Sequence, residues 1–178
     1  MQHVTAEAVR GSRRMGGNVK RYHTWPTIRQ QLVSDHTWNL LRIYIEAYGP
    51  PRPEVTEFIV YHDVPEIITG DFPYPIKVEF PEFRKAFDAV EEWASDKLGI
   101  KWPELYDHER KQIKQCDYVE MLEFATEELL MGNQFAQPIV HRMLFAVDLK
   151  DTAMRSYLIR SGVSEAQLNL VGGSNESK

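Results

Sequence analysis

Four side chains of types that bind metal ions stand out in this sequence. His36, His62 and Asp117 each lie on an otherwise apolar helical stripe, and Asp63 directly follows His62. Burying an imidazole or a carboxylate is unfavourable unless a cation or hydrogen bonds compensate. Two imidazoles and two carboxylates suit manganese, iron, cobalt, zinc or magnesium rather than a metal that prefers thiolates. We therefore expect one divalent metal ion, with coordination positions left for water and a phosphate oxygen.

The residues by themselves leave a second interpretation open. A single histidine on an apolar stripe is more often a hydrogen-bonded core residue, and a single aspartate there often bonds to a neighbouring helix. The alternative is a helical bundle with incidental polar residues. A protein without tightly bound metal would support that alternative.

The elements that must position these side chains are helices. Val55, Phe58, Ile59 and His62 follow the helical spacing i, i+3, i+4 and i+7, and Pro65 is expected to break or restart that helix. No segment shows convincing alternation of apolar and polar residues, so the fold class is all-α. Helices are predicted over about 33–48, from Pro53 to His62, over 83–98, over about 109–131 and over 138–159.

Details of these helices also follow from the pattern. Ser34 or Asp35 is the predicted N-cap of the first helix, which Gly49 ends. The helix over 83–98 is predicted to be amphipathic, with an apolar stripe of Phe83, Ala86, Phe87, Val90, Ala94 and Leu98. The helix over 109–131 is predicted to carry its acids on the stripe opposite its apolar one. An apolar stripe on that last helix contains Asp117.

Length and composition limit the class of protein. A chain of 178 residues with 43% hydrophobic content fits one globular domain, residues 1–178, with a flexible tail over about 172–178. A net charge of −5 argues against binding to a nucleic-acid polymer. One cysteine, no signal peptide and no apolar transmembrane run favour a cytoplasmic protein without membrane contact.

The spacing of the metal-binding residues resembles a known family. His36, His62-Asp63 and Asp117 match the H…HD…D signature of the HD-domain phosphohydrolases, and the resemblance spans about residues 19–133. Residues 61–73, YHDVPEIITGDFP, are similar to the central motif of the small bacterial 5′-deoxynucleotidases and the phage dATP triphosphohydrolases. This resemblance implies an HD-domain helical bundle with one divalent metal ion held between helices by those four residues.

The resemblance also implies roles in catalysis. Glu66 matches the acidic residue near the catalytic water, and it follows His62 by one helical turn. Its carboxylate could take a proton from the attacking water or deliver one to the leaving oxygen. The alternative is a solvated acid in the first turn after Pro65. Asp63 would act in catalysis through the metal.

Substrate contacts are implied in the same way. Arg21 matches a residue that grips phosphate, and Lys77 and Lys114 are further predicted phosphate contacts. Asp71 matches the residue that accepts a hydrogen bond from the sugar 3′-hydroxyl, with a turn-capping role as its alternative. Tyr22 stands where the 5′-deoxynucleotidases have a tryptophan that packs on the sugar. Its ring could pack on a deoxyribose in the same way, so selectivity for deoxyribose is expected.

The predicted function is metal-dependent hydrolysis of 2′-deoxynucleotides, with a preference for a triphosphate of the dATP type. That reaction would give a deoxynucleoside and inorganic triphosphate. The alternatives are a 5′-deoxynucleotidase acting on monophosphates, a nucleotide-binding HD signalling module without turnover, and hydrolysis of a cyclic or bis-phosphorylated nucleotide. The resemblance also implies a homo-oligomer, a dimer or larger.

Overall fold

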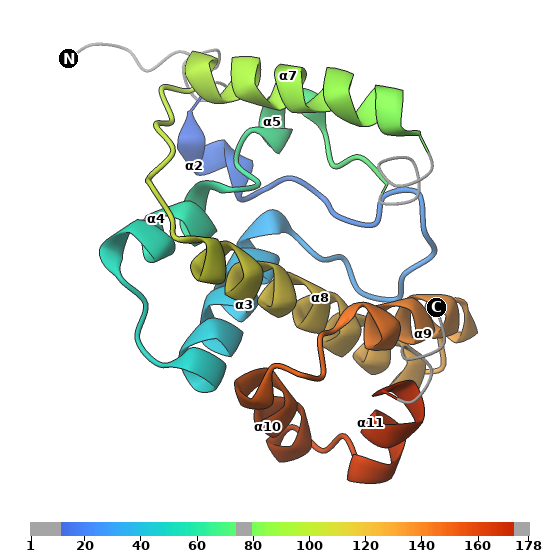
Figure 1. Ribbon diagram of the computed structural model, residues 1–178. Coiled ribbons are helices and arrows are strands. Elements are labelled where there is room, and N and C mark those ends of the chain that lie inside the picture. Colours follow the sequence, from blue (N-terminus) through green and yellow to red (C-terminus); the bar gives the residue numbers. More distant parts are fainter. Residues whose placement is uncertain (1–11, 74–79, 173–178) are drawn as a thin grey trace, which may run out of the picture. The chain divides into compact units, whose positions relative to one another are not determined.

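The computed structural model describes residues 12–73 and 80–172 and is all-helical there (Figure 1). No strand forms among these residues; one isolated antiparallel bridge pairs Lys20 with Leu32. The prediction of an all-α chain is confirmed. None of the described helices is long and apolar enough to cross a bilayer. The helices are α2 (Arg13–Gly16), α3 (Val33–Tyr48), α4 (Pro53–Tyr61), α5 (Glu66–Thr69), α7 (Pro81–Lys97), α8 (Asp107–Leu130), the 3₁₀ helix η1 (Gln134–Ala136), α9 (Gln137–Ala146), α10 (Thr152–Arg160) and α11 (Glu165–Gly172).

The described chain divides into two compact units. Of the described residues, the first unit contains 12–38, 56–73 and 80–104, and the second contains 39–55 and 105–172. Helices α3 and α4 therefore contribute residues to both units. The prediction of one domain over 1–178 stays a prediction. The residues of the predicted tail beyond Gly172 lie outside the described part.

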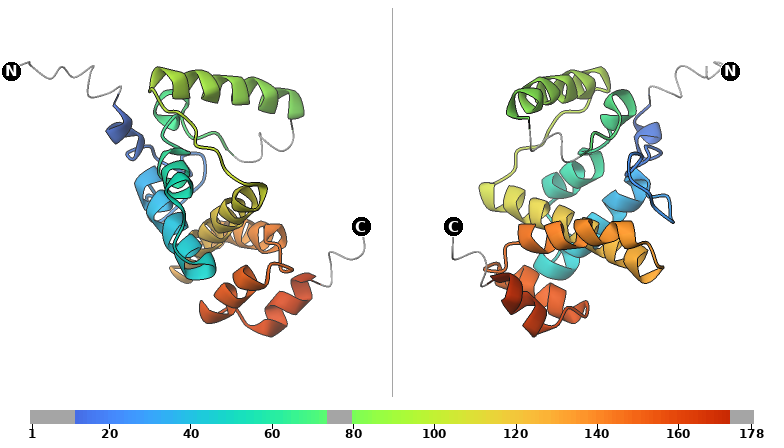
Figure 2. Two further views of the ribbon diagram at one scale, coloured as in Figure 1. Left: turned by 60° about the vertical axis from the view of Figure 1, so that its left-hand side comes forward. Right: turned by 90° about the vertical axis from the view of Figure 1, so that its right-hand side faces the viewer.

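The first unit packs α2 and α7 against the short helix α5 (Figures 1 and 2). Its core joins Val64 to Leu98 and Ile100, with Tyr61 and Ile67 packed against them. Apolar packing of this kind fixes the position of Val64, the residue that follows Asp63. The stripe predicted over 83–98 is only partly right, because it buries Phe87, Ala94 and Leu98 but leaves Ala86 and Val90 exposed.

The second unit packs α8 against η1 and α9, and α9 against α11 (Figure 2). Arg42 on α3 donates to Glu123 on α8 (2.5 Å) and to the hydroxyl of Tyr157 on α10 (3.0 Å). The Tyr157 hydroxyl in turn donates to Glu123. These hydrogen bonds link α3, α8 and α10, and they meet at Tyr157, which is 1% exposed.

Not all of the acids of α8 face solvent. Glu109, Glu120 and Glu128 are buried. Arg52 grips Glu109 with two parallel bonds, Nε to Oε1 at 2.8 Å and Nη2 to Oε2 at 2.9 Å. The Arg52 guanidinium lowers the pKa of the Glu109 carboxyl to about 2. A partner from a distant part of the chain thus allows a charged residue to be buried.

Two predicted helix ends need correction. Helix α3 begins at Val33, so Ser34 and Asp35 lie inside it, and Asp35 accepts a hydrogen bond from the N–H of Leu32 (3.0 Å). A carboxylate in the first turn that bonds back to the preceding N–H is the second half of a capping box. The single helix predicted over 138–159 is wrong as well. Asp151 begins α10 there by accepting from the N–H groups of Ala153 and Met154.

Candidate active site

The turn between α4 and α5 positions His62 and Asp63. The N–H of His62 still donates to Phe58 O (2.9 Å), and the N–H of Glu66 donates to Asp63 O (3.1 Å). Pro65 has no N–H, so the α4 hydrogen-bond ladder cannot continue through it. Helix α5 starts afresh at Glu66, as predicted for this proline. Residues 62–65 therefore form a turn between the two helices, and this turn carries the side chains of His62 and Asp63.

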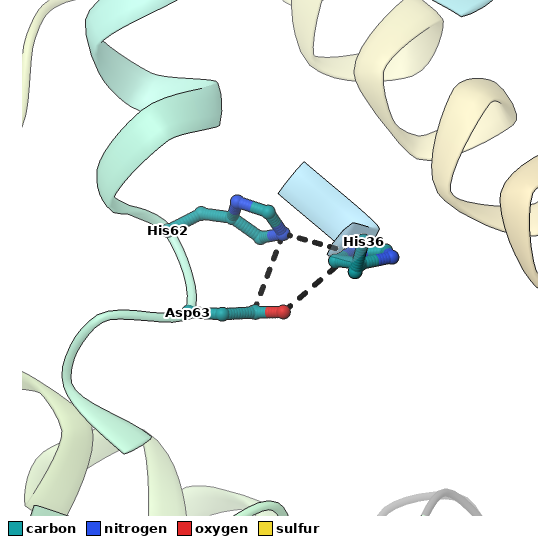
Figure 3. Close-up of side chains that lie close together, drawn as sticks. All are labelled: His36, His62 and Asp63. Atoms are coloured by element: carbon teal, nitrogen blue, oxygen red, sulfur yellow. Dashed lines mark hydrogen bonds and ion pairs between the residues drawn. The ribbon is translucent and has the colours of Figure 1, made fainter. Parts of the chain in front are cut away.

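Three of the four predicted metal ligands come together in the first unit: His36, His62 and Asp63 (Figure 3). Nε2 of His36 lies 3.3 Å from Nε2 of His62 and 3.5 Å from Oδ2 of Asp63. Nε2 of His62 lies 3.3 Å from Oδ1 of Asp63. Ligand atoms about 2.1 Å from one divalent ion are separated by about 3.0–3.4 Å from each other. The two spacings of 3.3 Å fall in this range and the spacing of 3.5 Å is just above it, so these donors are close enough to share one ion.

The orientation of the His62 ring supports this interpretation. Its Nδ1 lies 2.7 Å from the main-chain oxygen of Ile59, which can only accept a hydrogen bond. Nδ1 therefore carries the proton and Nε2 offers a lone pair toward His36 and Asp63. His36 is 0% exposed, so its ring is held away from water. A nitrogen pair at 3.3 Å is longer than a good hydrogen bond. The same separation is one that two ligands of a single ion adopt, so the group could hold a metal ion.

Arg21 adds a positive charge beside this group. Its Nη1 donates to Oδ2 of Asp63 at 2.9 Å. The residue belongs to a loop over 20–32 that the bridge between Lys20 and Leu32 closes, and its own N–H donates to Gln31 O (3.0 Å). The loop thus holds one predicted phosphate-binding residue against one predicted metal ligand.

Glu66 occupies the first turn of α5 and is 5% exposed. The alternative of a solvated first-turn acid is therefore excluded. A buried carboxyl three residues after Asp63 is suited to proton transfer in a site from which bulk water is withdrawn.

Asp71 and Tyr22 are in contact. The N–H of Tyr22 donates to Oδ2 of Asp71 at 3.2 Å, and Nδ1 of His23 lies 4.0 Å from the same oxygen. Gly70 has a φ of +75°, which only glycine adopts readily, and it turns the chain from α5 toward Asp71. The predicted sugar-binding carboxylate is thus bonded to the main chain of the predicted sugar-packing residue.

The remaining predicted site residues are Asp117, Lys114 and Lys77. Asp117 and Lys114 are on α8, in the second unit, and the Nζ of Lys114 donates to Oδ2 of Asp117 at 2.7 Å. The fourth metal ligand and this phosphate contact stay predictions. Lys77 lies outside the described residues.

Sequence reasoning missed two supporting features of this site. One is the Ile59 carbonyl, which orients the His62 ring. Ile59 precedes His62 by three residues at a helix end, so this bond could have been expected from the sequence. The other is Gly16, where a side chain would collide with Val64 beside Asp63. Nothing in the sequence pairs residues 16 and 64.

An all-helical chain with a buried histidine, a His-Asp pair after a helix and a nearby acid has the features of an HD-domain phosphohydrolase. The sequence profile described as YfbR-like 5′-deoxynucleotidase matches residues 14–148, more than half of the chain. The chain therefore belongs to the YfbR-like 5′-deoxynucleotidase family.

Individual relatives are more distant. The chain is 25% identical to a 5′-deoxynucleotidase of Vibrio parahaemolyticus, over 85% of this chain and 92% of that protein. It is 26% identical to the 5′-deoxynucleotidase YfbR of Escherichia coli, over 65% and 71% of the two chains. Among solved structures, the cyanophage S-2L HD phosphohydrolase DatZ, bound to dA and one catalytic Zn²⁺, matches with a TM-score of 0.60 and 19% identity. That match covers 90% of this chain and 95% of DatZ, and it shows the shared fold.

Proposed function

We propose that this protein is a metal-dependent 5′-deoxynucleotidase that hydrolyses 2′-deoxynucleoside 5′-monophosphates to the deoxynucleoside and phosphate. The observation that carries the proposal is the approach of His36, His62 and Asp63 at the spacing of ligands on one ion. Membership of the YfbR-like family supports the substrate class. Asp117 would complete the ligand set.

Each residue of the site has a task in this reaction. A bound divalent ion would supply a polarised phosphate and a water of lowered pKa. Glu66 would take the proton of the attacking water and return it to the leaving 5′-oxygen, so that no net proton is stored. Arg21 would hold the phosphate oxygens and offset their charge as the phosphorus is attacked. Its bond to Asp63 keeps it beside the ligand group before substrate enters.

The triphosphate preference inferred from the sequence stays untested. It rests on the resemblance of residues 21–24 to phage members and on three predicted cations, Arg21, Lys77 and Lys114, of which Lys77 lies outside the described residues. Membership of the YfbR-like 5′-deoxynucleotidase family is what favours the monophosphate in this proposal.

A turnover panel tests the proposal. Purified protein, supplied in turn with manganese, cobalt, zinc or magnesium, is offered dAMP, dATP, AMP, ATP and the other deoxynucleotides, with phosphate and triphosphate products resolved. We expect phosphate from deoxymonophosphates and its loss in Asp63→Ala and Glu66→Gln. Asp88→Ala and Glu92→Gln, exposed positions on α7, are matched controls expected to behave like wild type.

Other outcomes would redirect the assignment. Release of triphosphate from dATP, absent in Asp63→Ala, would make the protein a triphosphohydrolase. Silence across the panel with metal bound would contradict both reactions and favour a nucleotide-binding module without turnover.

We also propose that the protein forms a homo-oligomer. Val90 and Trp93 on α7 are 45% and 52% exposed, which leaves apolar area available for burial between copies. Light scattering coupled to gel filtration measures the mass directly, and a monomer at micromolar concentration would contradict this proposal.

A further inference from the structure

The His62-Asp63 pair occupies the middle of a hydrogen-bonded turn. The N–H of Val64 donates to Tyr61 O (3.0 Å), so Tyr61 and Val64 form the two ends of this turn. Val64 belongs to the buried core around Leu98, and Tyr61 packs against that core. Packing at the two ends therefore fixes the stretch of main chain from which both predicted ligand side chains leave.

Helix α2 contacts both ends of this turn and lies beside α5, the helix that follows the turn (Figure 1). At one end, Gly16 is so close to Val64 that an added Cβ would lie 2.8 Å from its Cγ1. At the other end, the guanidinium carbon of Arg13 lies 5.5 Å from the centre of the Tyr61 ring, within the range of a cation–π contact. Residues three apart share one face of a helix, so a single face of α2 holds the turn at both ends.

Arg13 is itself held in place by the end of α7. Its Nε donates to Leu98 O at 2.9 Å, and its Nη2 donates to Gly99 O. The last carbonyls of a helix have no partner within the helix and form the negative end of its dipole, so a cation is favoured there. Gly99 has the left-handed φ, +64°, that is common where a helix ends. The planar guanidinium can donate to both carbonyls at once, which fixes its position over the Tyr61 ring.

We infer that Arg13 is a positioning residue for the metal site. Its guanidinium, fixed by the end of α7, holds the Tyr61 ring, and Tyr61 begins the turn that carries His62 and Asp63. This inference rests on the proposed function, in which those two residues bind the divalent ion. Arg13 precedes residues 14–148, over which the chain matches its family, so that match assigns it no role.

Metal titration separates this role from a general effect of charge. For Arg13→Ala we expect the dissociation constant of Mn²⁺ or Zn²⁺, measured by calorimetry, to rise about fivefold. The loss is smaller than the loss of about tenfold or more found when a group bonded directly to a ligand is removed, because Arg13 acts one residue away. Arg14→Ala removes an equal charge from the neighbouring exposed position, so it is the matched control and should stay within about twofold of wild type. Equal losses in both variants, or no loss in Arg13→Ala, would overturn the inference.

A conservative change and a stability measurement distinguish positioning from a purely structural role. Arg13→Lys keeps the charge beside the ring but replaces the fork of donors by one nitrogen, so it should bind metal within about twofold of wild type. Denaturant unfolding of the metal-free variants is measured in parallel. A fall in the stability of Arg13→Ala without a fall in its metal affinity would assign the residue to the fold alone and overturn the inference.

A double-mutant cycle tests whether Arg13 acts through Tyr61. Tyr61→Leu keeps an apolar side chain for the core but removes the ring that faces the guanidinium. In that background Arg13→Ala should change metal affinity by less than about twofold, because the contact that it would break is already absent. A further loss of about fivefold there would mean that Arg13 acts independently of Tyr61, contrary to the inference.

Hydrogen exchange tests the same contact in metal-free protein. In Arg13→Ala we expect faster exchange in peptides that cover residues 61–66, whose N–H groups close the turn, with Arg14→Ala near wild type. Unchanged exchange in those peptides would overturn the inference. If wild-type protein bound no metal or hydrolysed no deoxynucleotide, the proposed function would fail, and this measurement would still decide whether Arg13 holds the turn.

Discussion

Gly16 is the position where a single methyl group should disturb the site most specifically. A Cβ added there would lie 2.8 Å from Cγ1 and 2.9 Å from Cα of Val64. The second distance involves the main chain, so rotation of the Val64 side chain cannot relieve the collision. Overpacking of this kind costs about 1–3 kcal/mol, and replacing a glycine in a helical conformation returns about 0.4–1 kcal/mol. These ranges leave a net cost of about 0–2.6 kcal/mol, and because a main-chain atom cannot move aside we expect Gly16→Ala to lower the free energy of unfolding by about 1–2 kcal/mol.

The displacement should also reach the metal. Val64 directly follows Asp63, so its main chain cannot shift without moving that carboxylate. We expect the affinity for metal to fall about tenfold, the smaller end of the loss seen when residues that orient metal ligands are replaced in other proteins. Denaturant unfolding of metal-free protein measures the first effect, and calorimetric titration with Mn²⁺ or Zn²⁺ measures the second.

Gly17→Ala is the matched control. Gly17 has an ordinary φ of −62°, and its added Cβ would lie 3.3 Å from the side-chain Cβ of Ser34. A small shift relieves that contact, so stability should stay within about 0.5 kcal/mol of wild type. Equal stability and equal metal affinity for the two alanine variants would refute the reasoning from Gly16.

Three further changes have defined outcomes. The pKa of Glu109 is about 2 in the folded protein and about 4.3 in an unfolded chain, so its carboxylate stabilises the fold above about pH 4.3 and loses that effect toward pH 2. The stability advantage of wild type over Glu109→Gln, followed by urea unfolding, should therefore shrink between about pH 5 and 2; a constant difference would contradict the pairing with Arg52. Asp151→Ala removes the acceptor for the N–H groups of Ala153 and Met154 and should cost about 1–2 kcal/mol in the same assay, whereas no loss would mean that the cap is replaceable. Removal of metal by a chelator should abolish phosphate release, and one equivalent of divalent ion should restore it.

Local signals predicted much of the fold. The helix over 33–48 agrees with α3 because a long apolar segment ends at Gly49, whose φ is +90°. The start of a new helix after Pro65 was predictable because proline has no N–H to continue the preceding helix. The break between α9 and α10 was missed because the apolar pattern continues through Val147, although Asp151 is a recognisable N-cap.

Features set by distant partners could not be read in this way. Burial of Glu109 depends on Arg52, which lies 57 residues away in the sequence. The N–H of Tyr22, a residue with a φ of +56°, donates to Asp71, 49 residues away. In the candidate site, three of the four residues predicted as metal ligands come together, whereas the bonds that orient them could not be read from the sequence.

A crystal soaked in Mn²⁺ or Zn²⁺ and measured at a wavelength with strong anomalous signal tests the central claim most directly. The account predicts one anomalous peak bonded to Nε2 of His36, Nε2 of His62 and the carboxylate of Asp63, with Asp117 as the fourth protein ligand. The Asp63→Ala protein should lose the peak. No peak at these atoms in wild type, or a peak bound to other residues, would contradict the account.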